Sequence, residues 1–277
     1  MSKLLWANWM RLRTGRGFWL ALGGVFLGSV LSIWSSSLSV RQMVQSGFVR
    51  TLDDCFFGPS TLLGALFAAF LCLFLSAEFA DGAVRNKLII GHSRAGVYLA
   101  NYLTCLGACL AFVCAWVLGS LPGLLWIGLF SMSAGEFWMY LLVAAGFTAA
   151  FTALFALVNL FFGNKAVTVV FSLALWLVLV LAAGALYDRL SEPELTGGVM
   201  YADGAFREVD PAPNPMYLAG PARMLCTLAL EFLPTGQALL MHGAQITAPW
   251  RQLGLSALFT ALFLWAGVRF FEKKEIR

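Results

Sequence analysis

Six long apolar stretches, separated by shorter polar ones, dominate the pattern along this chain. A segment within the bilayer core must satisfy its own backbone hydrogen bonds, so about 20 consecutive apolar residues predict a membrane-spanning helix. The sequence predicts six such helices, at residues 18–38, 56–77, 96–118, 137–161, 166–187 and 253–271. The predicted fold class is therefore an all-α integral membrane protein, with residues 1–277 forming one transmembrane domain.

Residues 1–17 combine apolar and basic positions at helical spacing. Leu5, Trp9 and Leu12 would share one face of a helix, with arginines between them. This predicts an interfacial helix whose tryptophans and cations face lipid headgroups. A basic leader before an apolar run is also typical of a secretory signal peptide, here with small residues at 35–37. The length of the apolar run favours a retained first span.

A polar stretch, residues 78–95, separates the second and third spans. Wound as one helix, Glu78, Asp81 and Arg85 fall on one face, and Asp81 and Arg85 have the i,i+4 spacing of an ion pair. Residues 91–93 (Gly-His-Ser) then interrupt the helical pattern. The sequence therefore predicts an amphipathic surface helix, a bend and a return into the membrane.

Residues 188–252, between the fifth and sixth spans, contain seven of the nine prolines and predict a long extracellular loop. Within it, residues 223–233 are apolar but too short to span, and a Pro-Thr-Gly sequence ends them. We therefore expect a re-entrant or interfacial helix before the last span. Glu231 is the one acid among these apolar residues. Either its carboxylate faces the aqueous boundary, or it belongs to an outer gate.

Composition and charge narrow the class of protein. The chain is 60% hydrophobic and only 12% charged, whereas a soluble domain has about a quarter of its residues charged. Six spans bring both termini to one side, which carries twelve of the eighteen Lys and Arg residues. The positive-inside rule therefore predicts cytoplasmic termini in a cell membrane, which we expect to be bacterial. The net charge of +4 reflects this asymmetry and gives no support to nucleic-acid binding.

The sequence contains no recognisable motif for nucleotide hydrolysis, metal binding or catalysis. It has no Walker-type phosphate loop, because alanine follows Lys165 where a hydroxyl is needed, so we expect no ATP hydrolysis and no cofactor in this chain. His92 and His242 fall on opposite predicted sides, which excludes a shared metal or catalytic site. We expect a protein that is not an enzyme. Cys55 and Cys226 share the predicted outer side, and their spacing leaves a disulfide open.

The stretch after the second span resembles a known family. Its order is Glu, an aromatic, a spacer, an acid, Gly, a small residue, a β-branched residue, then Arg-Asn-Lys and later Gly-x-Ser-Arg. This is similar to the first cytoplasmic loop of ABC exporter permeases of the type-two class. The six-span topology and a Pro-x-Gly-Gln turn at residues 234–237 are also similar. The resemblance implies a permease subunit that moves an apolar or amphipathic substrate outward: a lipid-like molecule, a peptide antibiotic or a drug.

The resemblance also implies partners and residue roles. The partners would be a separate ABC ATPase subunit that holds ATP and Mg, a second or related permease, and the lipid bilayer. Where the family commonly has Thr after the motif glycine, this chain has Ala83. The residues at ATPase-coupling motif positions are Glu78, Asp81, Gly82, Arg85, Asn86, Lys87 and Arg94. The outer-gate candidates are Glu231, Pro234 and Gly236.

Two alternatives from other classes stay open at this point. The whole chain could be a non-transporting polytopic membrane scaffold or sensor. The stretch at residues 78–95 could be a solvated loop held at the membrane by anionic lipids.

Overall fold

The computed structural model describes residues 2–45, 51–202 and 205–274, and most of them are helical. Within these described residues, six helices are long and apolar enough to cross a membrane, and they overlap the six predicted spans, which confirms a largely helical fold of membrane-protein type. These are α2 (Arg16–Gln45), α4 (Ser60–Ala80), α6 (Arg94–Ser120), α8 (Ala134–Val158), α9 (Lys165–Ser191) and α12 (Pro249–Lys273). The shorter helices are α1 (Ser2–Thr14), α3 (Asp53–Phe56), α5 (Ala83–Ile89), α7 (Gly123–Trp126), α10 (Gly220–Phe232) and α11 (Pro234–His242).

Polar side chains fix where three of the long helices begin. The Ser93 hydroxyl accepts a hydrogen bond from the backbone N–H of Gly96 at 3.2 Å, at the start of α6. Ser133 and Glu136 form a capping box at the start of α8, and Asn164 caps α9. Each cap satisfies N–H groups that have no partner within the helix, so these helix starts are encoded locally.

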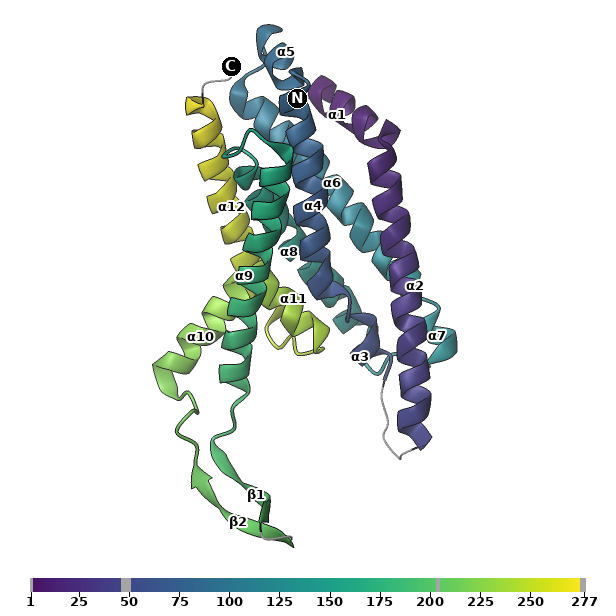
Figure 1. Cartoon of the computed structure of the whole chain (residues 1–277), viewed down its shortest axis with the longest axis vertical. Helices are drawn as coiled ribbons and strands as arrows, with labels where there is room; N and C mark the ends of the chain where they lie inside the picture. The colour runs from purple at the N-terminus through teal and green to yellow at the C-terminus, as the bar shows by residue number, and fades with distance from the viewer. Residues whose placement is uncertain (1, 46–50, 203–204, 275–277) are drawn as a thin grey trace.

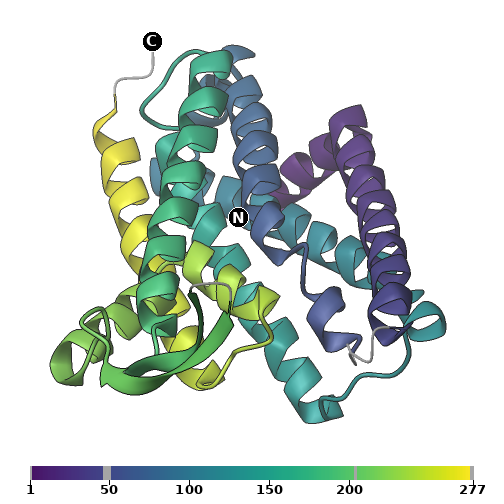
Figure 2. The ribbon, with the colours of Figure 1, turned by 60° about the horizontal axis from the view of Figure 1, so that its bottom comes forward.

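Helix α8 forms the centre of the bundle. It packs against α4, α6 and α12, and all residues from 150 to 158 are buried. Phe147, Phe151 and Phe155 follow one another along one face, with ring centroids about 6 Å apart. A helix that is hydrophobic on all sides belongs in a core, and its interspersed Ala, Gly and Thr residues let neighbouring helices approach closely. Figure 1 and Figure 2 show α2 and α12 on opposite sides of this core.

The two ends of the bundle differ in structure. Helices α1 and α5 and the C-terminal end of α12 lie at one end, which we call the α5 end (Figure 1). At the opposite, hairpin end, β1 (Leu195–Ala202) and β2 (Ala205–Pro213) form a two-stranded antiparallel hairpin with Leu195 opposite Pro213. The hairpin lies within the proline-rich segment and adds a strand pair that the all-α prediction did not contain.

Helix α1 occupies the predicted position of the interfacial helix and buries one row of side chains against the bundle. Leu4, Asn8 and Leu12 are buried, whereas Trp6 and Trp9 are 68% and 46% exposed. Leu5, Trp9 and Leu12 share one side of this helix as predicted, but only Leu12 of the three is fully buried. The i, i+4, i+8 row that contains Asn8 packs on α6, because Asn8 has a polar partner there.

Helices α10 and α11 meet at an angle of 96°, close to Pro234. A short apolar helix at residues 223–233 is thus confirmed, while its re-entrant position in a membrane stays a prediction. The bend is tight: a Cβ atom added at Gly236 would lie 1.9 Å from the backbone oxygen of Leu230. The Gln237 amide donates to the backbone oxygen of Glu231 at 2.7 Å across the bend. Glycine at 236 is therefore required by close backbone approach.

We expect Gly236→Ala to lower the free energy of unfolding by about 1–3 kcal/mol, because the added methyl group overlaps a backbone atom and the bend must open. Thermal unfolding in detergent measures the change. The control is Gly254→Ala in α12, where an added Cβ would meet no atom within 4 Å. Equal stability of the two variants would contradict the tight bend.

Candidate functional site at the α5 end

A closed ring of polar side chains joins four helices at the α5 end. Glu78 of α4 is 1% exposed and pairs through Oε1 with the Lys87 ammonium of α5. Lys87 also donates to Asn8 Oδ1 of α1 at 2.6 Å. The Asn8 amide donates to Asn101 Oδ1 of α6 at 2.7 Å, and the Asn101 amide donates to Glu78 Oε2. We call these four residues the Glu78 ring.

Arg11 of α1 supports the ring from outside. Its guanidinium lies 3.6 Å from Glu78 Oε1, donates to the backbone oxygen of Phe74 at 3.0 Å and stacks 4.1 Å from the centre of the Phe74 ring. The carboxylate therefore has two cationic neighbours and an amide donor. Burial of an ionised carboxylate is costly unless it is paired and hydrogen-bonded, and here both conditions are met.

The polar stretch after α4 contains a turn that the sequence did not predict. Gly82 has φ +66°, in the left-handed region that glycine adopts without strain, and it separates α4 from α5. The prediction of one helix from Glu78 onward is therefore wrong. Because of this turn, Asp81 and Arg85 do not keep helical spacing, and no ion pair joins them among the described residues.

Arg94, after the second bend, contacts the end of another span. Its guanidinium donates to the backbone oxygens of Phe271 at 3.2 Å and Glu272 at 3.3 Å, and also to that of Lys274. The last carbonyls of a helix have no partner within it, so Arg94 caps α12. Lys274 donates to the backbone oxygen of Leu160 at 2.6 Å, and partial burial lowers its pKa from the ordinary lysine value.

The seven coupling-motif residues thus divide into an inward group, an exposed group and one turn residue. Glu78, Lys87 and Arg94 point into the protein and hold α1, α4, α5, α6 and α12 together. Gly82 forms the turn. Asp81, Arg85 and Asn86 are exposed.

An exposed apolar pair lies beside these polar residues. Ile89 and Ile90 lie at the end of α5 and are 72% and 78% exposed. We call these five exposed residues the α5 outer face: Asp81, Arg85, Asn86, Ile89 and Ile90.

The outer-gate candidates lie together at the α10–α11 bend. The Glu231 carboxylate is buried and accepts two hydrogen bonds from the Arg251 guanidinium, at 2.5 and 2.6 Å. The Glu231 carboxylate is thus paired inside the protein, while its partner Arg251 is partly exposed. Pro234 and Gly236 begin α11 directly after the bend. The ion pair ties α10 to the start of α12, and the gate role of these residues stays a prediction.

Sequence reasoning missed three members of the Glu78 site: Asn8, Arg11 and Asn101. A signal for Asn8 was present, since it continues the Leu4–Leu12 row at spacing of four. Asn101 was a polar residue within an apolar span, which often marks a helix–helix hydrogen bond. Their pairing could not be read from the sequence, because 93 positions separate them.

Within the described residues, no group of three or more His, Cys, Asp or Glu side chains has a geometry suited to a metal ion. The Glu78 ring has its donors and acceptors used internally, which suits mechanical connection better than ligand binding.

Comparisons with known proteins assign no family to the chain. No model of a known protein family matches it, and a search of curated proteins finds no match.

We expect Glu78→Gln to lower the free energy of unfolding by about 1–3 kcal/mol, because Lys87 and Arg11 lose their counter-charge in a buried place. Thermal unfolding in detergent measures it. The matched control is Asp81→Asn, the same acid-to-amide change at an exposed position, which we expect to alter stability by less than about 0.5 kcal/mol.

A double variant tests whether Glu78 and Lys87 are coupled in their effect on the free energy of unfolding. Glu78→Gln with Lys87→Gln should cost less than the sum of the two single changes, since neither partner is left unpaired. Strict additivity would show that the two side chains do not interact.

Proposed function

We propose that this chain is the membrane-spanning permease subunit of an ATP-driven ABC exporter that moves an apolar or amphipathic substrate outward. A separate ATPase subunit would hold ATP and Mg, and a second or related permease copy would complete the transporter. In this proposal the protein lies in a bacterial cell membrane, with the α5 end and both termini in the cytoplasm.

The observation that carries the proposal is the α5 outer face on its rigid support. Ile89 and Ile90 form an exposed apolar pair beside three exposed polar residues. An apolar patch with a polar rim is typical of a protein-binding surface. The Glu78 ring fixes α5 to α1, α4 and α6, so a force on α5 reaches two long helices directly.

This arrangement suits transmission of movement. A packed element with satisfied polar contacts moves as a rigid body, and a small shift at an effector site is amplified when whole helices tilt. Closure of an attached ATPase would therefore tilt α4 and α6 together. Arg94 would extend the same movement to α12, because it caps that helix.

A scaffold or sensor would not require ATP hydrolysis, and this separates it from the proposed exporter. A lipid-anchored α5 would bind anionic vesicles with no ATPase present. The experiments below therefore measure ATP hydrolysis that depends on the α5 outer face.

We expect ATP hydrolysis to co-purify with the affinity-tagged chain from its native membrane. Asp81→Lys combined with Arg85→Glu should lower this associated hydrolysis at least about tenfold, because it inverts the charges of the α5 outer face. The control is Lys165→Glu, a charge reversal at an exposed residue that begins α9 near the same end. Thermal unfolding checks that each variant is folded.

A second variant removes only the apolar part of the surface. Ile89→Ser with Ile90→Ser should also reduce the co-purified hydrolysis, since burial of these side chains on the ATPase is lost. A folded wild-type chain that carries no ATP hydrolysis would overturn the exporter proposal.

A further inference from the structure

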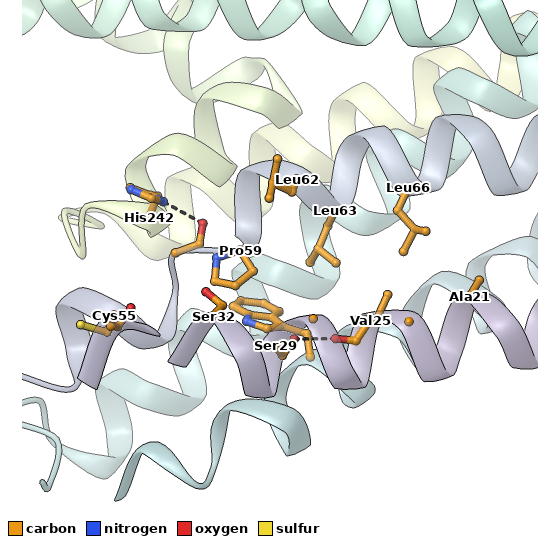
Figure 3. A pocket seen from close by; sticks show the side chains of 15 residues that line it. Ala21, Val25, Ser29, Ser32, Cys55, Pro59, Leu62, Leu63, Leu66 and His242 are labelled. Carbon is orange, nitrogen blue, oxygen red and sulfur yellow. Dashed lines mark hydrogen bonds between the residues drawn. The ribbon is translucent and has the colours of Figure 1, made fainter. Parts of the chain in front are cut away.

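A cavity of about 550 Å³ lies between α2 and α4 in the half of the bundle that faces the hairpin end (Figure 3). Helix α2 packs mainly on α6 and touches α4 little, so a space remains between α2 and α4. Trp116 of α6 contributes to the lining. The volume falls within the range of about 300–1,000 Å³ that is typical of small-molecule sites.

The lining changes from apolar to polar along the cavity. Val25, Leu63 and Leu66 line the part nearer the middle of the bundle, whereas Ser32 and His242 lie at the end near the start of α4, as Figure 3 shows. This end therefore offers hydrogen bonds, and the inner part offers only apolar contact.

Three polar side chains at this end have capacity for a ligand. Ser32 and Ser36 line the cavity and are half-buried, and among the described residues no hydrogen bond involves their hydroxyl groups. His242 donates from Nδ1 to the backbone oxygen of Gly58 at 2.8 Å, which leaves Nε2 as its second hydrogen-bonding atom.

Among the residues that the structure describes, the lining contains no Lys, Arg, Asp or Glu, so these residues offer no ion-pair partner for a charged headgroup. Because α2 and α4 are both long apolar helices, an occupant would enter from the hydrocarbon. We infer that this cavity binds an uncharged single-chain amphiphile, with its acyl chain beside Val25 and Leu66 and its hydroxyl headgroup at Ser32, Ser36 and His242.

Binding of the amphiphile does not require an ATPase. Its role as the exported substrate, however, rests on the proposed function. The test is therefore made on the purified chain alone, so that a failure of the cavity inference is distinguishable from a failure of the exporter proposal.

The probe is a monoacylglycerol with a photoreactive diazirine in its acyl chain, mixed into phosphatidylcholine nanodiscs that contain the full chain. After irradiation, peptide mapping should find the label on the cavity-lining residues of α2 and α4. Unlabelled monoacylglycerol should compete for this labelling, and anionic lysophosphatidylglycerol should not. Equal competition by the two lipids would contradict the inferred preference for an uncharged headgroup.

Gly28→Leu should lower labelling of these residues at least about tenfold, because the new side chain fills the cavity. A Cβ at Gly28 would meet no atom within 4 Å, so the variant is expected to fold. Gly23→Leu is the matched control: its Cβ also meets no atom within 4 Å, but Gly23 does not line the cavity. Undiminished labelling of Gly28→Leu would overturn the inference. Uniform labelling of all lipid-facing helices would also overturn it.

Discussion

The buried carboxylate of Glu78 is the constraint on which the α5 end depends. It lies at the end of a span, where an unpaired charge would be costly, and it needs partners from other elements. Lys87 supplies the charge, while Asn8 and Asn101 close the ring of hydrogen bonds. Satisfying one acid therefore fixes the positions of α1, α4, α5 and α6 relative to one another.

The same constraint explains why α5 is short and exposed. Lys87 must reach back to Glu78 across the left-handed turn at Gly82, which folds α5 over the end of α4. Once Lys87 and the buried Val84 face inward, Asp81, Arg85 and Asn86 face outward. The exposed surface of α5 is thus a consequence of its inward contacts, and the two groups of motif residues have separate physical roles.

The sequence predicted the features that depend on local pattern. Apolar runs of sufficient length predicted the six long helices, and Pro234 marked the end of α10. It did not predict the turn at Gly82, because a glycine inside a helical pattern is compatible with a continuous helix. Contacts between distant residues were also out of reach. The Glu231–Arg251 pair, for example, joins residues 20 positions apart across a bend whose angle only the fold determines.

Helix α4 connects the two regions for which we propose a function. Glu78 is near one end, and Leu63 and Leu66 line the cavity near the other, where Ser60 donates to the backbone oxygen of Ala238 in α11 at 2.9 Å. About 18 residues of helix separate Ser60 from Glu78, a length of about 27 Å. A tilt imposed at Glu78 would move the cavity wall. Because α4 packs closely on α8 and α9 but little on α2, the α2–α4 cavity is where such a tilt meets least resistance. In the proposed exporter, a movement of α5 that shifted α4 relative to α2 would therefore change the volume of this cavity.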